Sequence, residues 1–549
     1  MTGLQEGKSS TLSLRSTRTA MAGVLLLATA LYSWRLGEAP VYLGWDEART
    51  AVQGYSLATT GRDMTGARLP LLFHITDPLI PNHSSVTWWQ PFLFYLTAAM
   101  LRVAPIAQWS VRLPNIGLAM VNIWLAYLIA KRLFGNPWYG VLAAGMLALT
   151  PAHFFFARLA QDYFCPLPFV LLWLWCLLRY LPTDKSTEHS ALGTRHLALA
   201  PRATIWLAAA AGFALGAGLY THISSWIAMP FYFVATHVVL RVSRKPLRAH
   251  AAVSIGFAVA LVPLIVWVSA HPTLLHDMFQ NYGVATSSRV GERVTLYWDY
   301  FNPSYLFFAG GADPMWSTRR VGVFVLAFAV LLPCGTWHIV RRGFSIPRAL
   351  LVAGFLFAPL PIALTLPEAP RYATARDLLV LPFGVFIVVA GVEFLLANRR
   401  LIARTIAALL LASIPIQFLV FAGDYFTDYQ LRSAFRHDFL NVRGVVEYAI
   451  ASDAGASLPA VYLSDDLSAG KVVQWKFHLI THGREDLWPR TRYFSIDAFQ
   501  PDRIPAGSLL IVTTNNPRLN ELIGPNRCTI IHSVKDVTGT DAAAILLKN

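Results

Sequence analysis

Residues 113–132 read LPNIGLAMVNIWLAYLIAKR, an apolar run that ends in a Lys-Arg pair. A helix needs about 20 largely apolar residues to cross the hydrocarbon core of a bilayer. Basic residues collect in the cytoplasmic loops of membrane proteins, so the pair at 131–132 predicts that this helix ends at the cytoplasmic face. The segment before it, 37–112, must then lie outside the cytoplasm as the first outer loop.

The same pattern of apolar runs and basic ends recurs along 19–422. The run at 19–35 resembles a signal peptide, but the later spans alternate consistently only if it is retained as the first helix, which leaves 1–18 in the cytoplasm. The run at 91–101 has only about 11 apolar residues and predicts a re-entrant or interfacial helix. We expect about eleven crossings, at 19–35, 113–130, 138–156, 163–180, 204–221, 226–240, 251–270, 321–340, 349–366, 378–397 and 405–422.

The composition of the whole chain supports this class. Of 549 residues, 55% are hydrophobic and 14% are charged, and 45 Lys and Arg against 30 Asp and Glu give a net charge of +15. A soluble domain carries about 25% charged residues, so a water-soluble enzyme of several domains is excluded. The basic clusters stand at the ends of apolar runs, which indicates orientation in a bilayer and not nucleic-acid binding. The four cysteines show neither a disulfide framework nor a metal-binding spacing.

The composition changes to that of a soluble domain after about Tyr425. Apolar stretches of strand length at 459–466, 508–514 and 528–534 alternate with helix-like segments at 468–482 and 516–523. This alternation predicts a small α/β domain over 423–549. The parity of the spans places that domain outside the cytoplasm.

The first outer loop carries two adjacent carboxylates, Asp46 and Glu47, in the stretch GWDEAR. A carboxylate beside the lipid surface can supply a general base. Asp46 is also a good N-cap for a helix that runs to about Thr59, with Gly61 ending it. Capping and catalysis do not exclude each other, so both interpretations stay open.

A third acid, Asp162, stands at the outer end of the hairpin between two expected spans. An ionisable residue at membrane depth suggests a functional site. The alternative is that Arg158 and Asp162 form an i,i+4 pair on one helix face.

The outer face also carries arginines, which run against the usual charge bias of outer loops. Arg371 and Arg376 precede the span at 378–397. A guanidinium binds phosphate oxygens bidentately, so a phosphate ligand is one reason for their presence, and an interfacial anchor or an internal ion pair is another.

Aromatic and imidazole side chains near the outer ends of the spans are candidate substrate contacts. Trp45 and Trp89 can stack on sugar faces, although tryptophan at an interface is more often a membrane anchor. Tyr220 and His222 lie at the outer mouth of another span, and a lone histidine there is more often a satisfied buried residue than a ligand.

Six stretches in order resemble the membrane glycosyltransferases of the GT-C class, over about residues 20–400. The branch they resemble most is that of protein O-mannosyltransferases and lipid A aminoarabinose or galacturonosyl transferases. The stretches are WDEARTAVQGYSLATTGRDMTGARLP (45–70), RLPNIGLAMVNIWLAYLIAKRLFG (112–135), LALTPAHFFFARLAQDYFCPLP (147–168), GLYTHISSWIAMP (218–230), FNPSYLFFAGGADPMWSTRRVG (301–322) and PEAPRYATARDLLVLPFG (367–384).

The resemblance implies a GT-C fold in the plasma (bacterial inner) membrane and a reaction at its outer face. A sugar would pass from a polyprenyl-phosphate donor to an acceptor, which is a lipid, a glycan or a protein, with inversion at the anomeric carbon. In such enzymes the acid of the first outer loop is the presumed base, which corresponds to Asp46 with Glu47 beside it. The acid after the third span corresponds to Asp162, preceded by Arg158.

The resemblance also implies a cation for the donor phosphate, and Arg376 or Arg371 matches that position. One departure concerns the same phosphate: aminoarabinose-transferase-like members have Lys-Pro-Pro where this chain has Trp89-Gln90-Pro91, so a lysine contact is missing. Because the leaving group is a single phosphate, a metal is not obligatory, and the acids that would hold a divalent cation are Asp46, Glu47 and Asp162.

A transporter or flippase for lipid-linked sugars is the alternative function. Such proteins place ionisable groups near mid-membrane on broken helices, often with internal symmetry. Here the carboxylates stand at the outer rim, in a long asymmetric first loop, which favours the transferase.

Overall fold

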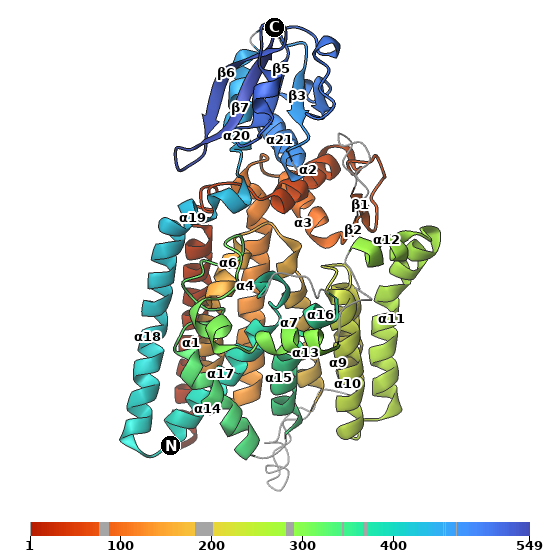
Figure 1. The fold of residues 1–549 in the computed structure, drawn as a ribbon. Helices are drawn as coiled ribbons and strands as arrows, with labels where there is room; N and C mark the ends of the chain where they lie inside the picture. Colours follow the sequence, from red (N-terminus) through yellow and green to blue (C-terminus); the bar gives the residue numbers. More distant parts are fainter. Residues whose placement is uncertain are drawn as a thin grey trace. The chain divides into compact units, whose positions relative to one another are not determined.

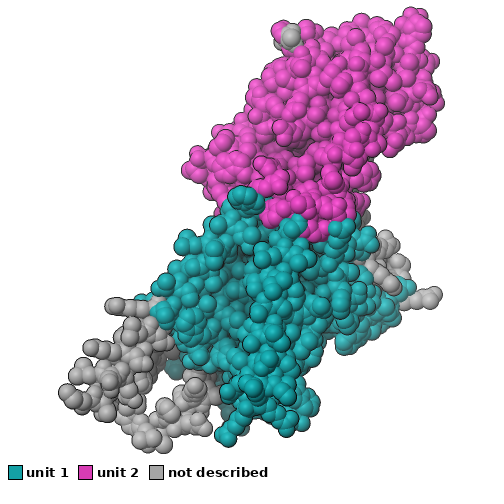
Figure 2. All heavy atoms as spheres, turned by 90° about the vertical axis from the view of Figure 1, so that its left-hand side faces the viewer, with its two compact units in different colours: residues 1–34, 88–92, 115–423 teal, residues 35–87, 93–114, 424–549 magenta. Residues whose placement is uncertain are grey.

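The computed structural model describes residues 2–75, 87–181, 201–281, 290–342, 345–365, 372–453, 455, 457–467 and 469–549, so Arg371 lies outside the described residues. The course of the chain is drawn in Figure 1. The chain forms two compact units, coloured in Figure 2: residues 1–34, 88–92 and 115–423 make the first, and residues 35–87, 93–114 and 424–549 make the second.

The first unit is built of apolar helices. Seven stretches of the described residues are helices long and apolar enough to cross a membrane, and an eighth follows if one bent pair counts as a span. The expected spans at 19–35 and 204–221 are largely helical, and that at 321–340 is helical from Phe328 on, but these helices fall short in length or hydropathy. The long helices are α1 (Thr2–Ser33), α4 (Gln108–Phe134), α7 (Pro166–Tyr180), α9 (Pro201–Gly218), α10 (Ser225–Val242), α11 (Leu247–Ala270), α14 (Phe328–Arg341), α15 (Ile346–Phe357), α17 (Val380–Ala397) and α18 (Leu401–Phe426).

The expected span at 138–156 is broken. It consists of α5 (Pro137–Ala148) and α6 (Pro151–Ala157), which meet at an angle of 64°. Pro151 lacks the N–H group that would continue the first helix, and its ring clashes with a helical carbonyl. Short helices complete this unit: α12 (Leu274–Asn281), α13 (Val290–Asp299), α16 (Leu360–Thr365), the 3-10 helices η1 (Asp162–Phe164) and η4 (Thr374–Arg376), and the π-helical turn η3 (Ser304–Phe308).

Glycines allow the helices of this unit to touch backbone to backbone. A Cβ on Gly212 of α9 would lie 2.0 Å from the Val253 carbonyl oxygen of α11, and one on Gly256 of α11 would lie 2.0 Å from the Ala209 carbonyl oxygen. Small residues at such crossings are typical of membrane helices, which associate through close packing and not through the hydrophobic effect.

The second unit contains the first-loop helices α2 (Trp45–Thr60) and α3 (Phe92–Leu101) together with the C-terminal domain. The helix expected at 91–101 is thus present, while its interfacial position remains a prediction. Strands β1 (Phe73–Ile75) and β2 (Thr87–Trp89) flank the undescribed residues 76–86. Helix α19 (Asp428–His437) follows α18.

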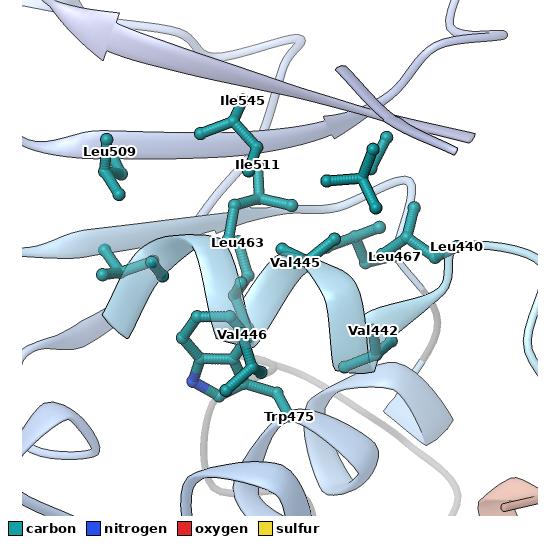
Figure 3. Close-up of a cluster of buried hydrophobic side chains, with 14 of the residues drawn as sticks. Leu440, Val442, Val445, Val446, Leu463, Leu467, Trp475, Leu509, Ile511 and Ile545 are labelled. Carbon is teal, nitrogen blue, oxygen red and sulfur yellow. The ribbon is translucent and has the colours of Figure 1, made fainter. Parts of the chain in front are cut away.

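The C-terminal domain has a five-stranded sheet of order β4-β3-β5-β7-β6. Strands β3 (Val461–Ser464), β4 (Thr491–Phe494) and β5 (Leu509–Thr513) are parallel, whereas β6 (Cys528–Lys535) and β7 (Asp541–Lys548) pair antiparallel. Helices α20 (Val442–Ser452) and α21 (Ala469–Thr481) bury Val446 and Trp475 against Leu463 and Ile511 of the sheet (Figure 3). A polytopic helical protein with a C-terminal α/β domain is therefore confirmed.

Gly256→Leu tests the backbone contact between α9 and α11. The added side chain meets the Ala209 carbonyl, so we expect a loss of about 1–3 kcal/mol in stability, as is usual for overpacking. The measurement is the melting midpoint in detergent. Gly117→Leu in α4 is the matched control, because a Cβ there meets nothing within 4 Å. Equal midpoints for the two variants would contradict the close contact.

Candidate active site

A fully buried ion pair joins Glu47 of α2 to Arg112 at the start of α4. The Arg112 Nε donates to Glu47 Oε1 at 2.8 Å, and its Nη2 donates to Oε2 at 3.0 Å. Both side chains are completely inaccessible to solvent. The three remaining N–H groups of Arg112 donate to the carbonyl oxygens of Leu36, Pro40 and Tyr42. Arg112 therefore fastens the chain that leads into α2 and satisfies all five of its donors.

Glu47 also closes a capping box. Gly44 is the N-cap of α2, and its backbone N–H donates to Glu47 Oε2 at 3.0 Å. A carboxylate with both oxygens held by a buried guanidinium is not available to bind a substrate. The geometry therefore gives Glu47 a structural role, in contrast to the catalytic role predicted for it.

Asp46 has a different environment although it is the next residue. The helix begins at Trp45 with Gly44 as N-cap, so the expectation that Asp46 caps it is wrong by two positions, while Gly61 ends the helix as expected. Asp46 is 8% exposed and lies in the first helical turn. The partial positive charge at a helix N-terminus stabilises negatively charged side chains in the first turn. Successive helical residues are about 100° apart, so the Glu47 contacts leave the Asp46 side chain to point elsewhere.

Arg158 is a structural residue of the first unit. It is wholly buried, and its Nη1 donates to the carbonyl oxygens of Tyr32 and Trp34 at the end of α1. Its guanidinium lies 5.2 Å from the centre of the Phe154 ring. The predicted phosphate contact does not fit this burial. Arg158 and Asp162 do not share a helix face, because α6 ends at Ala157 and Asp162 begins η1.

Tyr220 is likewise structural. Its hydroxyl donates to the Ala260 carbonyl at 2.7 Å and accepts the Leu264 N–H at 3.1 Å. It thus bridges the hydrogen-bond ladder of α11 beside Pro263, where a proline loosens the helix. The predicted substrate contact of Tyr220 has no support in this geometry.

Four side chains of the first unit gather around η1. The ring of Tyr163, next to Asp162, lies 4.8 Å from the ring of His222 and 6.0 Å from that of Trp316. Arg376 in η4 and His222 line one small pocket, together with Ser224 and Thr365. The sequence prediction thus contained two members of this group, His222 and Arg376, and missed Tyr163 and Trp316.

His222 is a buried, neutral imidazole. Its Nδ1 lies 2.7 Å from Ser224 Oγ and accepts the Ser224 backbone N–H at 3.1 Å. Burial, and after it the positive charge of Arg376, lower the pKa of His222 to about 3. Because Nδ1 accepts the backbone N–H, the ring proton belongs on Nε2, which makes that nitrogen a donor.

Arg376 is the cation of this pocket. It is half-buried, and among the described residues its guanidinium has no hydrogen-bond or ion-pair partner. The neighbouring Asp377 is buried and accepts a hydrogen bond from the Tyr305 hydroxyl at 3.2 Å. Burial raises the pKa of Asp377 well above its usual range, which disfavours its charged form beside Arg376.

The two tryptophans predicted as sugar contacts differ in their surroundings. Trp45 is 44% exposed and packs closely against Gly470 of α21. A Cβ added at Gly470 would lie only 2.7 Å from the Cβ of Trp45. The guanidinium of Arg49 lies 5.9 Å from its ring centre. Trp89 ends β2 and is half-buried.

The acids suggested as metal ligands do not form a set. Among the described residues, no three His, Cys, Asp or Glu side chains are grouped in a way that could hold a metal ion. Both oxygens of Glu47 are already occupied by Arg112.

Comparisons with known proteins bear on the fold. No protein-family model matches the chain, and no curated protein matches it by sequence. ArnT from Cupriavidus metallidurans bound to undecaprenyl phosphate matches with a TM-score of 0.59 at 15% identity, over 96% of this chain and 97% of that one. The apo ArnT structure gives 0.59 at 13%, over 95% and 97%.

An oligosaccharyltransferase from Archaeoglobus fulgidus gives a TM-score of 0.46 at 13% identity, over 86% of this chain and 64% of that one. The ArnT structures match nearly the whole length of both chains. The predicted fold is thereby confirmed: the chain has the GT-C fold of a polytopic membrane protein with a C-terminal α/β domain.

Proposed function

We propose that the protein is a membrane glycosyltransferase that moves a sugar from a polyprenyl-phosphate donor to an acceptor on the outer face of the membrane. The observation that carries the proposal is the pocket of Arg376, a half-buried guanidinium without a protein anion among the described residues. The undecaprenyl phosphate bound to the structurally similar ArnT supports the same class of donor.

The donor phosphate binds at Arg376 in this proposal. Its oxygens accept hydrogen bonds from the Arg376 guanidinium and from Nε2–H of the neutral His222. Thr365, at the end of the stretch Ile346–Thr365, lines the same pocket, so the phosphate stands at the end of an apolar membrane helix. This arrangement suits a ligand with a hydrocarbon tail and an anionic head.

The sugar lies against the aromatic residues next to this phosphate. Tyr163 contacts both His222 and Trp316, so its ring extends from the phosphate pocket toward a second aromatic surface. Asp162, adjacent to Tyr163, accepts hydrogen bonds from sugar hydroxyls in the proposal. Aromatic faces and carboxylates together distinguish a sugar from a simple lipid phosphate.

Asp46 is the general base. It takes the proton of the acceptor hydroxyl as that oxygen attacks the anomeric carbon, and the bond from this carbon to the phosphate oxygen breaks. The electron pair leaves with the polyprenyl phosphate, whose added charge Arg376 stabilises. A single displacement inverts the anomeric centre. The outer location of residues 423–549 belongs to the same proposal.

Asp46→Asn tests the base. We expect the turnover to fall by about 10²- to 10⁴-fold, because proton transfer contributes that much, with an unchanged melting midpoint. The assay follows release of free polyprenyl phosphate from a panel of polyprenyl-phosphate sugars by the purified protein. A lipid that crosses the bilayer unchanged, with no release from any donor, would favour a flippase instead.

Glu47→Gln separates structure from chemistry at the neighbouring position. It leaves Arg112 buried and without its counter-charge, which typically costs about 3–5 kcal/mol. We expect a clear fall in the melting midpoint, measured beside Asp46→Asn as the matched control. A Glu47→Gln protein with normal stability and no turnover would refute the structural role.

Arg376→Ala tests the phosphate contact. A lost charge-assisted hydrogen bond is worth about 1.5–3 kcal/mol, so we expect donor affinity to fall about 10- to 100-fold. Arg376→Lys should keep only part of the donor affinity, because an ammonium group does not bind phosphate bidentately. The exposed Arg102 provides the control variant Arg102→Ala. Unchanged donor affinity in Arg376→Ala would remove the phosphate from this pocket.

A further inference from the structure

A cavity of about 410 Å³ lies between the end of α14 and the start of α15. Apart from Ser345 and one arginine its lining is aliphatic, with Ile339 and Val340 from α14 and Val352 and Leu356 from α15. Arg348, in the first turn of α15, is the charged residue of the described lining. The cavity thus combines an apolar interior with one cation at its edge.

A second cavity of about 320 Å³ lies on another side of α15, against α10. Its walls include Val238 and Val242 of α10. Ala349 and Ala353 line both cavities. These small residues are one helical turn apart, so α15 leaves space toward both of its neighbours.

The arginines at this end of the unit differ in their partners. Arg342 pairs with Glu393 at 3.4 Å, and the guanidinium of Arg341 lies 4.3 Å from the centre of the Trp337 ring. Arg348 is half-buried, and its guanidinium has no hydrogen-bond or ion-pair partner among the residues that the structure describes. The Arg348 guanidinium is therefore available to an anion from outside the protein.

We propose that this cleft binds an anionic membrane phospholipid, with its phosphate on Arg348 and its acyl chains in the two cavities. Charge complementarity favours a lipid of net negative charge. Glu393, the acid named at this end of the unit, pairs with Arg342, so the positive charges of Arg341 and Arg348 add to a local excess. Basic pockets between membrane helices commonly bind such head groups.

The site is separate from the donor pocket. Arg348 begins the membrane stretch Ile346–Thr365, and Thr365 at its other end lines the pocket of Arg376. Arg348 in α15 and Thr365 at the end of α16 are 17 positions apart, roughly 25 Å along two consecutive helices, so the two sites lie toward opposite ends of this membrane stretch. The proposal therefore does not rest on the proposed transferase function.

The test uses full-length protein, stripped of lipid in a neutral detergent and titrated with phosphatidylglycerol or phosphatidylcholine. Native mass spectrometry counts bound lipid, and the melting midpoint reports stabilisation. We expect phosphatidylglycerol to bind and raise the midpoint more than phosphatidylcholine does. Arg348→Ala should weaken phosphatidylglycerol binding about tenfold, the loss of one charge-assisted contact. Ala353→Phe, which adds a ring at a residue that lines both cavities, should reduce the bound lipid.

Arg400→Ala is the matched control, because Arg400 is an exposed arginine at the same end of the unit, just before α18. It should bind phosphatidylglycerol as the wild type does. Equal binding of the two lipids, equal loss in Arg348→Ala and Arg400→Ala, or full binding by Ala353→Phe would each overturn the proposal. If Arg348→Ala does not fold, Arg348→Gln replaces it with the same expected result.

Discussion

The buried pair of Glu47 and Arg112 is the interaction on which the second unit's candidate chemistry depends. Moving two charges out of water costs several kcal/mol each, so such a pair persists only when every donor and acceptor is satisfied. Here five N–H groups of one guanidinium bind the carboxylate and three carbonyls of the chain before α2. The direction of α2, and with it the position of Asp46, follows from this network.

At two places in the protein, one residue has a structural role and its neighbour in sequence is a candidate for the chemistry. Glu47 is held by Arg112, while Asp46 next to it lies in the first turn of a helix whose dipole stabilises negative charge. Arg376 lines a pocket, while Asp377 is buried beside Tyr305 with its pKa raised. Burial disfavours the charged form of Asp377, so this acid competes less with an outside anion for Arg376. That electrostatic imbalance is the physical basis for placing a phosphate at Arg376.

Much of the fold could be predicted because membrane helices and buried strands leave strong periodic signals. The apolar runs and their basic ends located the helices, and three apolar stretches located β3, β5 and β6. Strand β4 (TRYF) is short and polar, and β7 (DAAAILLK) is rich in alanine, so neither showed a strand pattern. The break between α5 and α6 depends on Pro151, and an expectation based on apolar composition does not register the effect of a single proline.

The site was harder to predict because its contacts join distant residues. Spacing treats Asp46 and Glu47 as equals, and only Arg112, 65 positions away, separates their roles. Arg158 resembles a phosphate ligand in sequence, yet its guanidinium donates to a backbone carbonyl oxygen at the end of α1. Tyr163 and Trp316 come together only in the folded unit. The sequence did contain one signal for the buried pair. Arg112 stands on the outer side directly before an expected span, where an arginine runs against the usual charge bias.

The most direct test of the central claim is an experimental structure of the protein with a polyprenyl phosphate bound. We expect the phosphate within hydrogen-bond distance of the Arg376 guanidinium and of Nε2 of His222, with the tail along the apolar helices. A phosphate bound elsewhere, with Arg376 in contact only with solvent or protein, would contradict it.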